Sequence, residues 1–238
     1  MATIDYTTFT ETDPSNKLTV TSTKIDAAAL PEEDIAHVVL DKGAGFFDGD
    51  FEHLLEGYVD AATVNGIHSG GWGVGDHANP ETTDNTKGDS LFMKLQEESA
   101  VAIFTASEHD NSNTYQDTVS VNKDTLYYLK IVRDEAVGTY GTLYVYVYSD
   151  SGRTTLVDTA SLALHTSKKD FRYLYGWLNY ANEVGAYTFT GYVQNLDIQE
   201  AAATSIKTIN GITQANVKTV DSITNANIKS VSGISNTS

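Results

Sequence analysis

Three acidic side chains alternate along the segment Asp48-Gly-Asp-Phe-Glu52. In an extended strand every second residue lies on the same face, so this spacing would bring the three carboxylates together. A pair of carboxylates is what glycoside hydrolysis uses, one as nucleophile and the other as acid and base. Gly49 favours a turn between the two aspartates, however. We therefore interpret the segment as a polar turn that enters a strand, and we expect no catalytic residue.

Acidic residues beside glycine-rich turns also suggest a metal site. Calcium takes roughly six to eight oxygen ligands, many of them from acidic loops, and Asp48 and Asp50 are the candidate ligands here. The run Glu108-His-Asp110 contains ligand types for a transition metal, but the six histidines show no paired His-x-x-x-His spacing. Apart from calcium we expect no cofactor.

A row of tyrosines alternates with aliphatic residues in the segment 143–148, Leu-Tyr-Val-Tyr-Val-Tyr. A strand with this pattern turns its aliphatic side chains to one face and Tyr144, Tyr146 and Tyr148 to the other. A sugar can stack on a tyrosine ring and hydrogen-bond to its hydroxyl. We expect these tyrosines to bind carbohydrate, the alternative being that they belong to the core. Trp72, surrounded by glycines, is expected at or near the surface as a further carbohydrate contact.

The composition restricts the class of protein. The 238 residues include 32 acidic and 15 basic side chains, a net charge of -17 that opposes nucleic-acid binding through a basic surface. There is no cysteine, hence neither a disulfide nor a cysteine-ligated zinc site. The first residues do not read as a secretory signal, and no apolar window is long enough to insert into a membrane as a helix.

Hydrophobic alternation over many short segments predicts an all-β fold. Strand signals recur with turn residues between them, and helical periodicity is almost absent. This pattern favours an antiparallel jelly-roll β-sandwich over residues 1–200. Aromatic residues disappear after that point, which predicts a separate C-terminal tail over residues 201–238. The predicted strands lie at 18–25, 51–64, 91–95, 101–105, 126–133, 143–148, 154–164, 171–178 and 187–198.

Several of these segments resemble a known family in their amino-acid sequence. The runs 42–53, 126–135, 138–144 and 191–198, with F-E-H, Y-Y-L-K-I and N-L-D-I, resemble concanavalin A-like (laminin G-like) jelly rolls, in particular those of tailed-phage structural genes and environmental sequences. The resemblance implies the sandwich fold and calcium in acidic loops. Glucanases of this fold share a Glu-x-Asp-x-(x)-Glu motif, from which the run 48–52 departs because aspartate replaces the leading glutamate.

The last 33 residues consist of three consecutive, nearly identical repeats of eleven residues each. Isoleucine, valine, threonine and asparagine are poor helix formers, so we expect short extended rungs separated by turns. The tail resembles those of phage virion proteins, and its net charge is +2 whereas the rest of the chain carries -19. We expect it to dock on an acidic neighbouring copy, the alternative being a flexible linker. The expected assembly residues are Ile206, Ile209, Ile212, Val217, Val220, Ile223, Ile228, Val231 and Ile234.

These observations favour a non-catalytic structural or adhesive virion protein, such as a capsid decoration, fibre or spike subunit. It would be made in the host cytoplasm, assemble with itself and with other virion proteins, and contact surface glycans. The alternatives are a carbohydrate-binding module and a self-assembling extracellular filament or surface subunit, followed by a glycoside hydrolase. Neither nucleic acid nor membrane insertion is expected.

Overall fold

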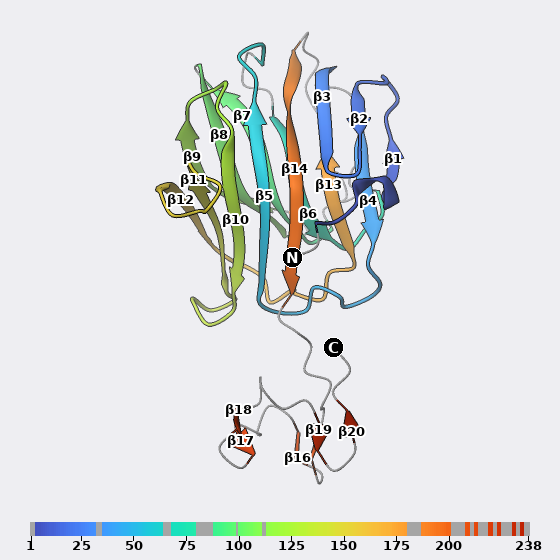
Figure 1. Ribbon diagram of the computed structural model, residues 1–238, viewed down its shortest axis with the longest axis vertical. Coiled ribbons are helices and arrows are strands. Elements are labelled where there is room, and N and C mark those ends of the chain that lie inside the picture. The colour runs from blue at the N-terminus through green and yellow to red at the C-terminus, as the bar shows by residue number, and fades with distance from the viewer. Residues whose placement is uncertain are drawn as a thin grey trace. The chain divides into compact units, whose positions relative to one another are not determined.

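The body of the protein is a sandwich of two seven-stranded sheets in this computed structural model (Figure 1). The structure describes residues 3–31, 35–63, 68–79, 88–98, 100–110, 113–179 and 187–200, together with six two-residue strands in the tail. The predicted all-β jelly-roll sandwich is confirmed. The chain divides into two compact units, Met1–Gln199 and Glu200–Ser238. No helix in the described part of the chain is long and apolar enough to span a membrane.

Sheet A has the strand order β1-β4-β13-β6-β7-β8-β9. Neighbouring strands of this sheet pair in antiparallel orientation. β7 and β8 form a long hairpin that includes the two strands predicted at residues 91–95 and 101–105. Its strands are β1 (Thr10–Thr12), β4 (His37–Asp41), β13 (Tyr173–Leu178), β6 (His68–Gly75), β7 (Ser90–Glu98), β8 (Val101–Asp110) and β9 (Asn113–Val121).

Sheet B has the strand order β12-β11-β10-β5-β14-β3-β2 and lies nearer the viewer in Figure 1. A 3-10 turn, η1 (Tyr6–Thr8), precedes β1 and is capped by the carboxylate of Asp5. The strands of sheet B are β12 (Leu156–Ala163), β11 (Thr142–Tyr148), β10 (Tyr127–Asp134), β5 (Phe51–Val59), β14 (Thr188–Glu200), β3 (Lys24–Pro31) and β2 (Leu18–Val20).

The core lies between the two sheets and follows directly from the alternation of side chains. Every second residue of β5, from Phe51 through Leu55 to Val59, is buried, while the residues between are half-buried. The same pattern holds along β10, and together with the inner face of sheet A these residues form one hydrophobic cluster. One face of each of these strands therefore lies in the core and the other face points outward, because side chains alternate along a strand with a period of two.

The tail unit forms three short antiparallel hairpins, one in each eleven-residue repeat. β15 (Thr208–Ile209) pairs with β16 (Ile212–Thr213), β17 (Thr219–Val220) with β18 (Ile223–Thr224), and β19 (Ser230–Val231) with β20 (Ile234–Ser235). The predicted extended rungs are confirmed. Six of the nine expected assembly residues lie in these strands, whereas Ile206, Val217 and Ile228 lie outside the described residues. Their role in assembly stays a prediction.

Candidate functional site

The outward face of sheet A carries a group of polar side chains around His109. Phe104 and Ala106 of β8 point into the core, so the alternate residues Thr105, Ser107 and His109 point away from it. On β7 the directly opposite residues are Lys94, Phe92 and Ser90, in that order. We call these six residues, Ser90, Phe92, Lys94, Thr105, Ser107 and His109, the His109 face.

This face is unusually buried for the outer side of a sheet. Ser90 and Ser107 are 0% exposed, Thr105 is 1% exposed and His109 is 4% exposed. The hydroxyl oxygens of Ser90 and Thr105 have no hydrogen-bond partner among the described residues. A buried hydroxyl without a partner costs free energy, so each such group calls for an explanation, such as a catalytic role or a bound water or ion.

Two aromatic rings extend the His109 face across the sheet. The Phe92 ring lies edge-on to His109, with centroids 5.3 Å apart, and the Tyr175 ring lies 5.7 Å from Phe92 on the other side. The Tyr175 hydroxyl donates a hydrogen bond to the carbonyl oxygen of His77. Beyond His109, the exposed Thr114 of β9 is its direct cross-strand partner.

Glycines of β6 make room for these rings. A Cβ at Gly73 would lie 2.3 Å from Cδ1 of Phe92, and one at Gly75 would lie 2.7 Å from the Tyr175 hydroxyl. The glycine-rich run is therefore a flat strand whose outer face has no side chains. Trp72, on the opposite face of β6, is 1% exposed and donates a hydrogen bond from Nε1 to Nδ1 of His53 at 2.9 Å. The prediction that Trp72 lies at the surface as a carbohydrate contact is wrong, because its ring fills the core.

The residue types on the His109 face permit proton transfer but not two-carboxylate hydrolysis. His109 is a potential acid or base and Lys94 a cation, with serine and threonine hydroxyls around them. Glu108, the neighbour of His109 in the chain, points into the opposite face and is 3% exposed there. It accepts hydrogen bonds from the backbone N–H groups of His165 and Thr166, at 2.7 and 3.2 Å. Glu108 and His109 therefore cannot ligate one metal ion.

The acidic motif at residues 48–52 does not build a catalytic pair either. Asp48 and Asp50 precede β5 in an irregular segment, as the predicted turn requires, and Oδ1 of Asp50 accepts a hydrogen bond from the backbone N–H of Glu135 at 2.7 Å. Glu52 on β5 forms an ion pair with Lys130 at 3.3 Å. No group of three or more histidine or acidic side chains in the described residues is arranged to hold a metal ion. Calcium at Asp48 and Asp50 stays a prediction.

The tyrosines of β11 point outward from sheet B. Leu143, Val145 and Val147 are completely buried, whereas Tyr144, Tyr146 and Tyr148 are half-buried on the other face. The ladder is thus a surface feature and the aliphatic side chains are core, as the sequence indicates. Carbohydrate binding by these tyrosines stays a prediction.

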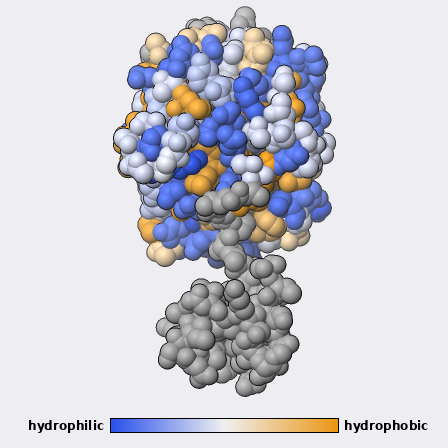
Figure 2. Space-filling view, in the orientation of Figure 1, coloured by the Kyte–Doolittle hydropathy of each residue, from blue (hydrophilic) through white to orange (hydrophobic). Residues whose placement is uncertain are grey.

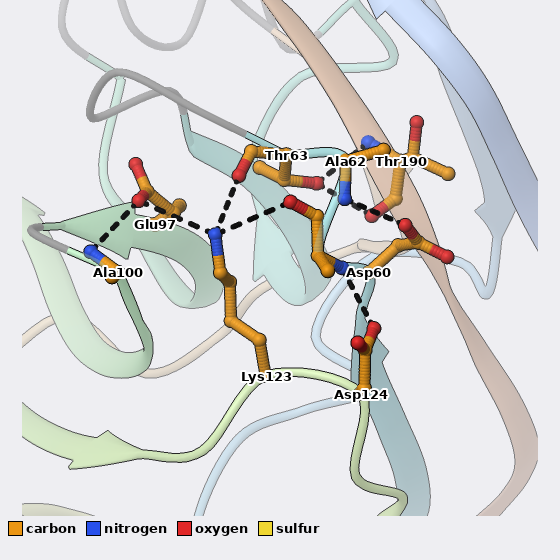
Figure 3. Close-up of polar contacts among 9 residues, drawn as sticks. Asp60, Ala62, Thr63, Glu97, Ala100, Lys123, Asp124 and Thr190 are labelled. Atoms are coloured by element: carbon orange, nitrogen blue, oxygen red, sulfur yellow. Dashed lines mark hydrogen bonds and ion pairs between the residues drawn. The ribbon is translucent and has the colours of Figure 1, made fainter.

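A second polar cluster joins the loops at one end of the sandwich (Figure 3). The ammonium of Lys123 points between the carbonyl oxygens of Ala61 and Thr63, at 3.4 and 2.9 Å, and the carboxylate of Glu97, at 3.4 Å. The Asp124 carboxylate accepts a hydrogen bond from the backbone N–H of Ala61 at 2.7 Å. Each group in the cluster is bonded to another, so the cluster is suited to fixing the loop after β5 in place.

Comparisons with known proteins concern the fold. No protein-family model and no curated protein matches the chain. Among solved structures, the alginate lyase Aly36B is 12% identical, with a TM-score of 0.48 over 83% of this chain and 88% of that one. An endo-β-1,4-glucuronan lyase from the fungus Trichoderma reesei is 10% identical, with a TM-score of 0.47 over 83% and 90%. The enzymatically active domain of tailspike protein 2 from bacteriophage CBA120 is 11% identical, with a TM-score of 0.49 over 84% and 30%.

These similarities overturn two predictions made from the sequence. Alginate lyases and a glucuronan lyase are among the similar structures, which contradicts the prediction of a non-catalytic structural protein and the prediction that the chain is not an enzyme; at 10–12% identity the likeness itself shows the fold alone. In the sequence, His109 stands out only within the run Glu108-His-Asp110, where its residue type suggests a metal ligand. A role in proton transfer was not predicted, although Thr105, Ser107 and His109 alternate with core residues. The predicted virion location stays a prediction.

Proposed function

We propose that the chain is a polysaccharide-cleaving enzyme of the lyase type, with its active site on the His109 face. The observation that carries this proposal is the burial of a histidine and partnerless hydroxyls on the outward side of a sheet. The hydroxyl groups of a bound sugar could complete the hydrogen bonds of these groups. Aromatic rings beside polar groups are the usual lining of a carbohydrate site.

The reaction is an elimination at a uronic acid residue. A base removes the proton on the carbon next to the carboxyl group, the bond from the neighbouring carbon to the glycosidic oxygen breaks, and a carbon–carbon double bond forms. The departing oxygen then takes up a proton from an acid. His109 is the base in this proposal, and the ammonium of Lys94 balances the charge that develops on the substrate carboxyl group. Such a reaction needs no carboxylate pair, which agrees with the side chains present.

The test is direct detection of the unsaturated product. The full chain is incubated with alginate, polyglucuronate and polygalacturonate, and the ultraviolet absorbance of the new double bond is followed. We expect cleavage of at least one polymer, and we expect His109→Ala to lower the rate about 100-fold or more, the usual contribution of a general base. The matched control is His165→Ala, because this histidine stacks on Tyr115 away from the His109 face. Absence of unsaturated product from all three polymers, or an unchanged rate in the folded His109→Ala variant, would show that the proposal is wrong.

A further inference from the structure

The outward face of sheet B gathers tyrosines from four neighbouring strands. Each of their side chains is half-buried and alternates along its strand with a residue of the core. On β10, Tyr128 lies directly opposite Tyr148 of β11, which joins the row on β11 to the middle of the sheet. We call this set the tyrosine face: Tyr58, Tyr128, Tyr144, Tyr146, Tyr148 and Tyr192.

The rings of the tyrosine face hold one another in place. Tyr144 and Tyr146 are stacked with centroids 5.5 Å apart and an interplanar angle of 20°, and Tyr148 follows at 6.5 Å. At the other side of the face Tyr58 stacks on Tyr192 at 4.9 Å. Side chains that are already ordered lose little conformational entropy when a ligand binds. The row on β11 spans about 13 Å, four residues at the rise of an extended strand.

Two lysines among these tyrosines each form an ion pair with a carboxylate of the same face. Lys130 forms an ion pair with Glu52 at 3.3 Å, and its ammonium lies 5.1 Å above the centre of the Tyr146 ring. Lys24 pairs with Asp26 at 2.6 Å and lies 3.8 Å above the Tyr192 ring. Positive charge on this face is therefore compensated within the face, which gives a polyanion little to bind.

The phenol groups are available as neutral hydroxyls. Burial raises the pKa of Tyr146 and of Tyr192 above the ordinary value of 10.0, so both stay protonated at neutral pH. The side of the molecule over sheet B shows mostly hydrophilic and intermediate residues with isolated hydrophobic ones between them (Figure 2). Such a surface fits a ligand that is rich in hydroxyl groups better than it fits an apolar protein partner.

We propose that the tyrosine face binds a neutral polysaccharide chain, at a site separate from the His109 face on the opposite sheet. Sugar rings contact the aromatic row of β11, and the phenol hydroxyls of Tyr144 and Tyr146 hydrogen-bond the sugar hydroxyls. The two faces belong to different sheets, with the core between them. This second site does not depend on cleavage by the first.

Affinity electrophoresis of the full chain tests the proposal. The gels contain hydroxyethyl cellulose, xylan, soluble amylose or agarose as neutral polysaccharides, and alginate as an acidic one. We expect retardation by at least one neutral polymer. The double variant Tyr144→Ala, Tyr146→Ala should weaken that binding about tenfold or more, since each stacked or hydrogen-bonded ring contributes on the order of 1 kcal/mol.

Two further variants keep the result interpretable. Tyr144→Phe with Tyr146→Phe preserves the stacked rings and removes only the hydroxyls, so it should fold as the parent does and still bind more weakly. Tyr140→Ala is the matched control, because Tyr140 is a 42% exposed tyrosine in the loop between β10 and β11 and outside the tyrosine face. Binding to none of the four neutral polymers, retardation by alginate alone, or equal binding by the parent and both double variants overturns the proposal. His109→Ala should bind like the parent, which separates this proposal from the proposed cleavage.

Discussion

A single methyl group added at Gly73 tests whether the ring arrangement of the His109 face matters to the protein. The new Cβ would lie 2.3 Å from Cδ1 and 2.7 Å from Cε1 of Phe92, and 3.0 Å from the backbone oxygen of Leu91. Carbon atoms in ordinary contact are about 3.5–4.0 Å apart, so the Phe92 ring has to move by about 1 Å or more. Tyr175 and His109 lie on its two sides, at 5.7 and 5.3 Å. The displaced ring therefore disturbs at least one of these neighbours.

Overpacking of this kind costs about 1–3 kcal/mol of the free energy of unfolding. For a chain of this size each kcal/mol lowers the melting temperature by roughly 2–4 °C, so Gly73→Ala should lower it by roughly 2–12 °C. Urea unfolding followed by tryptophan fluorescence gives the free energy, and the buried Trp72 on the opposite face of the same strand reports directly on the strand.

The matched control is Gly49→Ala, because a Cβ at Gly49 meets no atom within 4 Å. Its free energy of unfolding should stay within about 0.5 kcal/mol of the parent value. If the two variants have the same stability to within that margin, the close approach of Phe92 to β6 is not a constraint, and β6 does not hold the aromatic rings beside His109 in a fixed order.

Three other results are expected. Lys123→Met should lower the free energy of unfolding in urea by about 3 kcal/mol, because it removes an ammonium that pairs at 3.4 Å with the Glu97 carboxylate, 6% exposed. Lys130→Met on the surface should cost less than about 1 kcal/mol, and equal losses in the two variants would contradict this expectation. The hydrogen bonds from Arg172 lower the pKa of Asp41 to about 2 from 3.8, so the stabilisation by this pair is complete above the ordinary pKa and is lost as the pH falls from about 4 to about 2. An NMR titration of Asp41 should show that midpoint, and Arg172→Gln should move it up toward 3.8; an unmoved midpoint would exclude Arg172 as the cause. Because the chain carries a net charge of -17, cleavage of a polyuronate under the proposed function should become faster as salt is raised to about 0.1–0.2 M, and a rate that falls steadily would point to a positively charged approach path.

The alternation of side chains allowed much of the sandwich to be predicted from the sequence. The strand over 143–148 and the one that begins near residue 51 each carry a strict period of two, and a strand with that period can bury only one of its faces. The outward position of Tyr144, Tyr146 and Tyr148 follows from it. The extended rungs of the tail follow from a local cause as well, since β-branched residues next to turn residues favour short strands over helix.

Tertiary structure alone decided where the candidate site lies. Trp72 in a run of glycines reads as a surface residue, but β6 is a central strand of sheet A with a core on one face and the rings of its neighbours on the other. The surroundings of His109 give little signal in the chain, because Ser90 and Phe92 belong to another strand and the burial that they share depends on the sheet. Local pattern determines which face of a strand a side chain occupies. The register of the whole sheet decides which residues meet across strands. The loops that pack across the sheet decide which carboxylate accepts a hydrogen bond from a backbone N–H, as Asp50 does.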